Sequence, residues 1–312
     1  MNKKVSSTLA LTLCAIIWGT AFVAQRAGME NIGPFFYSAS RMLIGAIALI
    51  PISLVSIKGQ DADRRRKGLP AVSPEQREKE KKIVLKGGAV CGFIIFFAAN
   101  TQQVGLVSTS AGKTAFITTL YIILVPLLGL FVKQLLNLFN WIGVGLATTG
   151  LYFLCITENL TIARGDLIIL IGALFWALHI LFMDHYAPKV NVAKLVCVQF
   201  FVAGLMSLAV ALVIESFIWE SFIVALPGIL YVGVMSTAVA FTFQALGQKN
   251  ANPTVASIIL STESLFGAIS GYLILGEMLT SREIIGCLLM FIAVIIAQLP
   301  TKKERLAMRK EG

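Results

Sequence analysis

Ten long apolar stretches run through this sequence, and they restrict its fold more than any other feature. A stretch of roughly 20 apolar residues is long enough to cross the hydrocarbon core of a bilayer as an α-helix. The stretches cover residues 7–26, 34–57, 83–105, 109–132, 139–157, 166–187, 192–214, 222–247, 253–275 and 282–300. Turn residues or charges bound each of them. The sequence therefore predicts an all-α integral membrane protein with ten transmembrane helices.

The composition agrees with a membrane protein and excludes several other classes. Of the 312 residues, 57% are hydrophobic and 13% are charged, whereas soluble domains carry roughly a quarter charged residues. A soluble globular enzyme, a disordered chain and a nucleic-acid-binding module are therefore excluded. The formal net charge of +10 lies mostly in one polar loop, residues 58–82, and in the two tails. There it orients a membrane protein rather than binding a polyanion.

The distribution of lysine and arginine predicts the orientation of the spans, because cytoplasmic connections carry an excess of these residues. With the N-terminus in the cytoplasm, the outer side holds only Arg26, Lys113, Arg164 and Arg282. The inner side then holds Lys3, Lys4, the basic cluster at 58–86, Lys133, Lys189, Lys194, Lys249 and the basic tail at 301–312. Both termini are therefore expected in the cytoplasm, which requires an even number of spans.

The two halves of the sequence resemble each other, which indicates an internal duplication. At an offset of 143 residues the identical pairs are Thr119/Thr262, Leu130/Leu273, Leu136/Leu279, Ile142/Ile285, Gly143/Gly286 and Leu146/Leu289. At an offset of 158, Trp18 aligns with Trp176. We therefore expect one five-helix repeat at 1–157 and a second at 158–300. Because five is odd, the second repeat is inverted in the membrane, as in secondary transporters that bind substrate near the midplane between their repeats.

A set of short motifs lies within the predicted spans. They are Ile17-Trp18-Gly19-Thr20-Ala21-Phe22, Arg41, Gln102-Gln103-Val104-Gly105-Leu106, Ala115-Phe116-Ile117-Thr118-Thr119-Leu120-Tyr121, Val125-Pro126, Trp176-Ala177-Leu178-His179, Glu263 and Leu275-Gly276-Glu277. As a set they resemble the drug/metabolite transporter superfamily, EamA type. The sequence departs from the family at Ser264, where Pro is usual, and at Gln134, which replaces an acidic residue. The resemblance implies a ten-helix carrier in a bacterial plasma membrane that moves small metabolites, often outward.

Signatures of catalysis and of metal binding are absent from the sequence. The five cysteines are an odd number, all in apolar stretches and without a CxxC pair, so neither a disulfide framework nor a zinc site is expected. HExxH, GxSxG, P-loop and Asp-rich motifs are missing as well. We expect no enzyme activity, no metal and no cofactor. Without a nucleotide site, transport is expected to depend on an ion gradient, with protons as the candidate ion, or on exchange.

Four polar or charged residues lie at membrane depth, where inserting a charge costs at least roughly 2.5–3.5 kcal/mol. Glu263 is a candidate proton carrier or cation-binding carboxylate, and the alternative is a protonated carboxyl that bonds a neighbouring helix. Arg41 is a candidate for binding a substrate carboxylate bidentately, or else it forms an ion pair or a headgroup anchor. Lys113 is a further candidate for coupling or charge, and the alternative is that it snorkels from the outer end of its span. His179 lies mid-span and is a candidate because a histidine side chain ordinarily titrates near neutrality, although a structural, hydrogen-bonded histidine is the favoured interpretation.

Hydroxyl side chains form a stripe in each of two repeat-related spans, because residues four and seven apart share a helix face. The stripes are Thr114, Thr118 and Tyr121 in span four and Ser257, Ser261 and Ser264 in span nine. They correspond position by position at the offset of 143, which predicts two walls of one central cavity. The alternative is that the hydroxyls bond carbonyl groups of their own helices. Further candidate lining residues are Trp18, Trp176, Asn100, Gln102, Gln103, Gln199 and Gln244.

Together these features favour a secondary active transporter of small metabolites, amino acids or related amphiphilic compounds, that exports its substrate by alternating access. Its partners are then the small-molecule substrate and the lipid bilayer. An intramembrane enzyme is the first alternative and should show clustered catalytic groups at membrane depth. A membrane receptor or scaffold is the second and should carry a sizeable soluble domain or tail.

Overall fold

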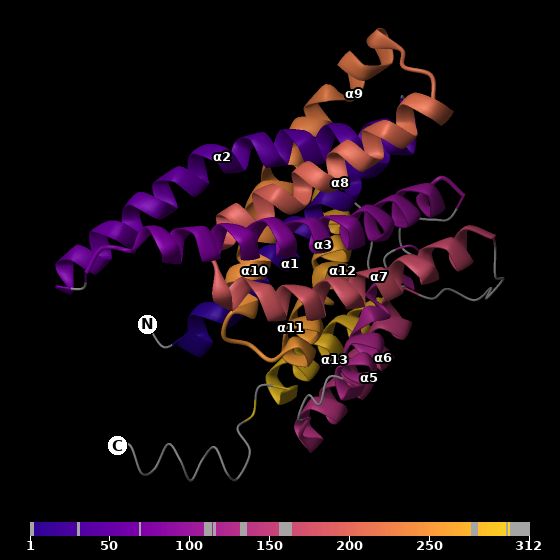
Figure 1. Ribbon diagram of the computed structural model, residues 1–312. Helices are drawn as coiled ribbons and strands as arrows, with labels where there is room; N and C mark the ends of the chain where they lie inside the picture. Colours follow the sequence, from indigo (N-terminus) through magenta and orange to yellow (C-terminus); the bar gives the residue numbers. More distant parts are fainter. Residues whose placement is uncertain are drawn as a thin grey trace.

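The computed structural model describes residues 3–29, 32–68, 70–108, 114, 117–131, 136–155, 164–275, 280–297 and 299, and most of these residues are helical (Figure 1). No strand occurs among these residues. The helices of the first half are α1 (Lys3–Met29), α2 (Pro34–Arg66), α3 (Pro74–Leu106), α5 (Tyr121–Phe131) and α6 (Leu138–Cys155). Those of the second half are α7 (Arg164–Tyr186), η1 (Ala187–Lys189), α8 (Val192–Ile214), α9 (Trp219–Tyr231), η2 (Val232–Ala240), α10 (Phe241–Gln248), α11 (Pro253–Leu260), α12 (Glu263–Leu275) and α13 (Ser281–Ala297).

Helical segments occupy the described part of every predicted span, which confirms the all-α, ten-span architecture. The spans predicted at 222–247 and 253–275 are each assembled from consecutive helical pieces, namely α9–η2–α10 and α11–α12. Among the described residues, five helical segments are long and apolar enough to cross a membrane, namely α2, α3, α7 with η1, α8 and α9–η2–α10. Shorter apolar helices account for Val5–Ala21, Ile117–Phe131, Leu138–Phe153 and Ile284–Ala297.

The packing of the helices follows the predicted duplication. Corresponding spans of the two halves lie against each other, α2 on α8, α5 on α11 and α6 on α13. The contact of α3 with α7 has its counterpart in the contact of α9–η2–α10 with α1. Large apolar side chains cover much of the outer surface, as expected where lipid tails rather than water surround a bundle.

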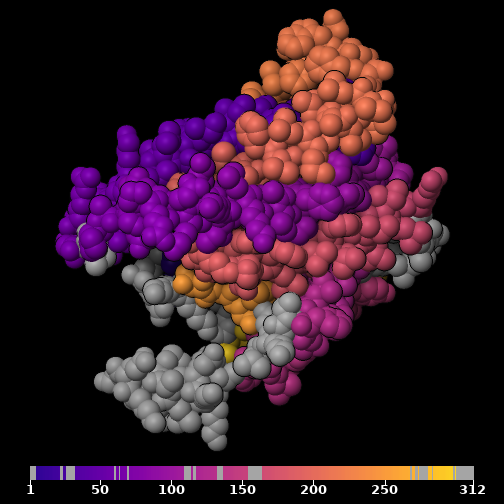
Figure 2. Space-filling model, in the orientation of Figure 1, coloured from indigo at the N-terminus to yellow at the C-terminus, as the bar shows by residue number. Residues whose placement is uncertain are grey.

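The polar segment predicted as a loop at 58–82 is largely helical. α2 continues to Arg66, and α3 begins at Pro74, so the two helices form a hairpin that projects from the bundle (Figures 1 and 2). Gly68, in the left-handed region at φ 66°, follows the end of α2. Ser73 and Gln76 form a reciprocal capping box, with both hydrogen bonds at 3.2 Å, at the start of α3. Caps satisfy the backbone N–H and C=O groups that are left without partners at helix ends. These capping signals therefore allow α2 and α3 to extend beyond the apolar pattern.

Two carboxylates attach this hairpin to α8 at its two ends. The carboxylate of Glu215, at the C-terminal end of α8, accepts the backbone N–H groups of Phe35 (2.9 Å) and Phe36 (2.8 Å) in the first turn of α2. The carboxylate of Glu80 in α3 accepts the N–H of Asn191 (3.0 Å) and pairs with Lys194 (3.4 Å) at the start of α8. A carboxylate at a helix N-terminus satisfies free N–H groups and the helix dipole, so α2, α3 and α8 are fixed together.

A very close approach of α1 and α12 shapes the centre of the bundle. A Cβ atom built on Gly19 would lie 2.7 Å from the carbonyl oxygen of Glu263 and 2.7 Å from the amide nitrogen of Gly267. Only a glycine allows the two backbones to come so near, which is the usual way that membrane helices pack tightly. The contact places the beginning of α12, and with it Glu263, directly against α1.

Candidate functional site

The span predicted at 253–275 is interrupted in its middle, and Glu263 begins the second piece. α11 ends at Leu260, two turn residues follow, and α12 starts at Glu263. The hydroxyls of Ser261 and Thr262 donate to the carbonyls of Ile258 (2.8 Å) and Ile259 (2.6 Å). Hydroxyl groups that bond the preceding turn compete with the helical backbone pattern. At the interruption two amides bond the carbonyl three residues back, Thr262 to Ile259 (3.1 Å) and Ser264 to Ser261 (3.3 Å), and irregular backbone at membrane depth is tolerated only inside the protein or along a cavity.

The corresponding span of the first half is interrupted at nearly the same place. Leu120 forms a turn before α5 begins at Tyr121. Its amide donates to the carbonyl of Ile117 (3.2 Å), a three-residue bond that is tighter than the four-residue bond typical of an α-helix. At the offset of 143, Leu120 corresponds to Glu263. Matched interruptions in two inverted halves are the feature that most directly indicates a substrate site in secondary transporters.

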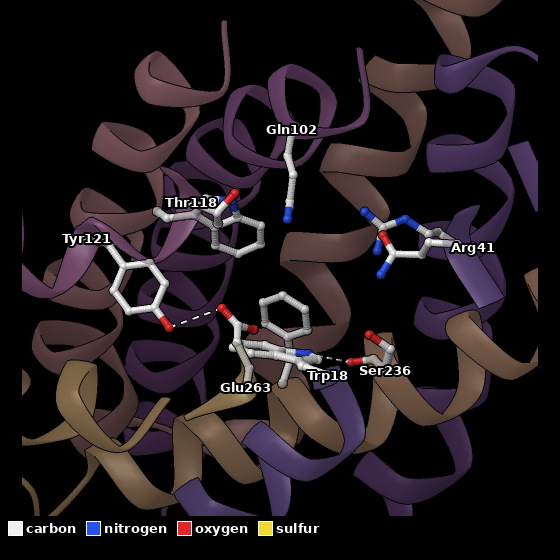
Figure 3. Close-up of a pocket in the computed structure, with 10 residues that line it drawn as sticks. Trp18, Arg41, Gln102, Thr118, Tyr121, Ser236 and Glu263 are labelled. Carbon is white, nitrogen blue, oxygen red and sulfur yellow. Dashed lines mark hydrogen bonds between the residues drawn. The ribbon is translucent and has the colours of Figure 1, made fainter. Parts of the chain in front are cut away.

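The two interruptions touch each other through their side chains. The hydroxyls of Thr119 and Ser264 share a hydrogen bond of 3.1 Å, and the phenol of Tyr121 donates to Oε1 of Glu263 at 3.3 Å (Figure 3). All four side chains are buried. The two repeats are therefore joined at the interruptions by polar contacts.

A cavity opens beside these contacts (Figure 3). The volume not filled by atoms is about 420 Å³ when the space that opens to solvent is included, and the centres of water molecules can occupy about 40 Å³ of it. This conformation therefore has room for a few waters. The lining residues are Trp18, Gln25, Arg41, Gln102, Thr118, Tyr121, Trp176, Ser236, Phe241 and Glu263. They come from both halves of the chain.

Aromatic rings form one wall of the cavity. The centroid of Trp18 lies 4.7 Å from that of Phe241 and 6.3 Å from that of Trp176, within the range of favourable aromatic contacts. The indole N–H of Trp18 donates to the carbonyl of Ser236 at 3.3 Å. Ser236 belongs to η2, a π-helical segment of nine residues. Such segments are rare and often lie at functional sites, and this one brings a backbone carbonyl close to the cavity.

Glu263 and Arg41 bring opposite charges to the same cavity. Each is 5% exposed. Among the described residues Glu263 has one hydrogen-bond partner, Tyr121, and the Nε of Arg41 has none. Figure 3 shows their side chains on different sides of the cavity, with Trp18 beneath, and no ion pair joins them in the part of the chain that the structure describes.

Seven of the residues expected from the sequence line this cavity. They are Trp18, Arg41, Gln102, Thr118, Tyr121, Trp176 and Glu263.

The hydroxyl stripe expected in span nine is placed differently. The hydroxyls of Ser257 and Ser261 donate to the carbonyls of Thr254 and Ile258 in their own helix, both at 2.8 Å, and Ser264 bonds Thr119. None of the three is among the lining residues. Bonding within the helix satisfies each hydroxyl without a cavity, so the two predicted walls are not equivalent in this conformation.

The other expected residues lie around the cavity rather than in its wall. His179 is fully buried and its Nε2 lies 3.2 Å from Oε1 of Gln199. The Oε1 of Gln244 and the hydroxyl of Thr114 are buried without a partner among the described residues. Lys113 lies outside the described residues.

Three lining residues were not expected from the sequence, namely Gln25, Ser236 and Phe241. The pairing of Trp18 with a second tryptophan was the available signal for an aromatic wall, but nothing in the sequence indicated the π-helical segment. Within the described residues no group of three or more His, Cys, Asp or Glu could hold a metal ion.

An inverted duplication of helices around a polar cavity between interrupted helices defines a membrane transport protein. The sequence matches the EamA-like transporter family over residues 6–156 and again over residues 163–298. The chain therefore belongs to the EamA-like transporter family, and each half carries one copy of its repeat.

Relatives along the whole chain are named as transporters. An uncharacterized transporter of Archaeoglobus fulgidus is 28% identical over 298 residues, covering 95% of this chain and 87% of the relative. YoaV of Bacillus subtilis, also an uncharacterized transporter, is 26% identical and covers 93% and 94%. YedA, an uncharacterized inner membrane transporter of Escherichia coli K12, is 23% identical and covers 93% and 90%. A solved crystal structure shares the fold, with a TM-score of 0.73 at 15% identity over 99% of this chain and 100% of the other.

Proposed function

We propose that this transporter is a secondary active carrier that moves small metabolites by alternating access through the central cavity. The observation that carries the proposal is the meeting of the two interrupted helices, through Thr119 with Ser264 and Tyr121 with Glu263, beside that cavity. In inverted-repeat transporters the substrate and coupling-ion sites lie at such interruptions. Amino acids or related amphiphilic compounds suit walls that are both charged and aromatic, and we expect export.

Glu263 is the residue that we expect to couple transport to protons. It is buried at the start of a half-helix, and among the described residues its hydrogen-bond partner is a phenol rather than a cation. A carboxyl at membrane depth without a compensating cation is expensive and marks proton pathways in carriers. Tyr121 comes from the other repeat, so a change in the charge of Glu263 acts directly on the contact between repeats.

The protein is expected in a bacterial plasma membrane with both termini in the cytoplasm. The relative YedA is named an inner membrane transporter. The basic residues of the α2–α3 hairpin and of the C-terminal tail favour the cytoplasmic side.

Proton coupling is tested with purified protein in liposomes. Uptake of a labelled amino-acid mixture should depend on an imposed pH gradient, and Glu263→Gln should abolish that dependence while the protein stays folded. Glu220→Gln, at an exposed position in the first turn of α9, is the matched control and should behave as wild type. Unchanged proton dependence in a folded Glu263→Gln variant would contradict the coupling role.

The cavity is tested by filling it. Thr118→Trp adds a large ring to a side chain that is 3% exposed and lines the cavity, so transport should fall at least tenfold while the fold is kept. Thr149→Trp, on the exposed face of α6, should transport normally. Normal transport by the Thr118 variant, or unfolding of the kind that overpacked cores show, would argue against a substrate pathway there.

A further inference from the structure

Arg41 is a buried cation without a counter-ion in the described part of the chain. It is 5% exposed, lines the cavity, and its Nε is buried with no hydrogen-bond acceptor. Its guanidinium makes no hydrogen bond or ion pair with a described side chain. Because it faces the cavity rather than the outer surface (Figure 3), a lipid headgroup does not serve as its partner. A buried charge is costly unless it is paired.

Two side-chain amides line the same cavity, and they too lack hydrogen-bond partners among the described residues. Gln25 of α1 and Gln102 of α3 are each 8% exposed and line the cavity with Arg41. Neither makes a hydrogen bond within the described residues, and Figure 3 shows the end of Gln102 directed into the space between Arg41 and Thr118. Three donor-bearing side chains from α1, α2 and α3 therefore surround one cavity with their hydrogen-bonding capacity unused.

We propose that Arg41, with Gln102 and Gln25, forms a subsite for a carboxylate group of the transported compound. The inference rests on the proposed transport function and adds the requirement that the transported compound carries a carboxylate. A guanidinium binds a carboxylate through two parallel hydrogen bonds, and side-chain amides can donate to the remaining oxygen lone pairs. The first repeat supplies all three residues.

The subsite restricts the class of substrate. Glu263 lies on another side of the cavity (Figure 3), so a substrate that carries only a positive charge leaves Arg41 buried and unpaired. Simple lipophilic cations are thereby selected against, since an unpaired buried charge weakens binding. The rings of Trp18, Trp176 and Phe241 accept an apolar body next to the carboxylate.

The first test needs no ligand and measures the midpoint of thermal unfolding of the purified protein in detergent. Arg41→Met replaces an unpaired buried cation with an apolar chain of similar length, so the ligand-free midpoint should rise or stay unchanged. A fall of several degrees would show that Arg41 has a structural counter-charge, and it would overturn the proposal.

The second test uses three probes on one carbon skeleton: phenylalanine, phenylalaninamide and 3-phenylpropionate. The two carboxylates should raise the unfolding midpoint of the wild type, and the amide should not. Arg41→Gln should remove the response, and Arg41→Lys, which keeps the charge without the fork, should weaken the Kd at least about tenfold. Gln244→Leu, a buried amide outside the lining, is the matched control and should keep the response.

Three results would overturn the carboxylate subsite: no Arg41-dependent response to either carboxylate, an equal response to the amide, or a response only to 2-phenylethylphosphonate in place of the carboxylates. Transport is measured separately in liposomes loaded with extracted cell metabolites. Export of compounds that lack a carboxylate would refute the carboxylate subsite, but the proposed carrier function would stand. Absence of any transport, with Arg41-dependent binding preserved, would remove the carrier function and leave the subsite.

Discussion

Replacing Gly19 with alanine should destabilise the protein because α1 and α12 are too close for a side chain between them. The new Cβ would lie 2.7 Å from backbone atoms of Glu263 and Gly267, whereas ordinary contact begins at 3.4 Å. The helices must therefore separate by about 0.7 Å, since backbone atoms cannot rotate away. A gap of 0.5–1 Å forfeits roughly a quarter to a half of each dispersion contact along an interface.

The expected loss in the free energy of unfolding is about 1–3 kcal/mol, the usual range for overpacked interiors. Helix propensity acts in the opposite direction, because alanine is favoured over glycine by about 1 kcal/mol in a helix. Gly145→Ala in α6 isolates that second effect, since its Cβ would meet nothing within 4 Å. Gly145→Ala should therefore be as stable as wild type or slightly more stable.

The measurement is reversible unfolding in mixed micelles, followed by helical signal as denaturing detergent is added. Transport by Gly19→Ala should fall as well, because α1 positions the start of α12 and its Glu263. If Gly19→Ala and Gly145→Ala are equally stable, the close approach of α1 and α12 does not hold and the reasoning is wrong.

Two further predictions concern single polar contacts. Glu215→Ala removes the carboxylate that accepts the N–H groups of Phe35 and Phe36, so the free energy of unfolding should fall by about 1–2 kcal/mol. Glu215→Gln should recover part of the loss. An unchanged free energy of unfolding in Glu215→Ala would show that the cap is not stabilising. A double-mutant cycle of Tyr121→Phe and Glu263→Leu, which removes the acceptor, should give a coupling energy of about 1 kcal/mol, as for a typical buried hydrogen bond, and strictly additive effects would contradict the contact at 3.3 Å.

The sequence predicted those site residues whose chemistry is unusual at their own positions in the chain. Glu263 and Arg41 were evident because a charge at membrane depth needs a reason, and Trp18 with Trp176 because the offset of 158 aligns them. Gln25 carried no comparable signal, since it lies near the end of its span and has no repeat-related partner in the pattern.

The direction in which a hydroxyl side chain points could not be predicted from the sequence. Thr118 and Ser261 are repeat partners, yet Thr118 lines the cavity and Ser261 bonds the carbonyl of Ile258. In a membrane bundle the lipid-facing and inward-facing surfaces are both apolar, so hydrophobic periodicity does not tell one helix face from the other. The same ambiguity hid the role of Ser236, whose carbonyl reaches Trp18 because η2 is π-helical.

The sequence by itself determined that this protein is a bundle of ten membrane-spanning helices in two related halves. Those properties follow from segment length, charge placement and self-similarity, which act along the chain and need no knowledge of neighbours. Tertiary structure alone decided where the helices break, which of two equivalent hydroxyls faces the cavity, and that Arg41, Gln102 and Glu263 share it. These features depend on how closely backbones from the two halves approach, as at Gly19, and that distance is set only when all the helices pack together.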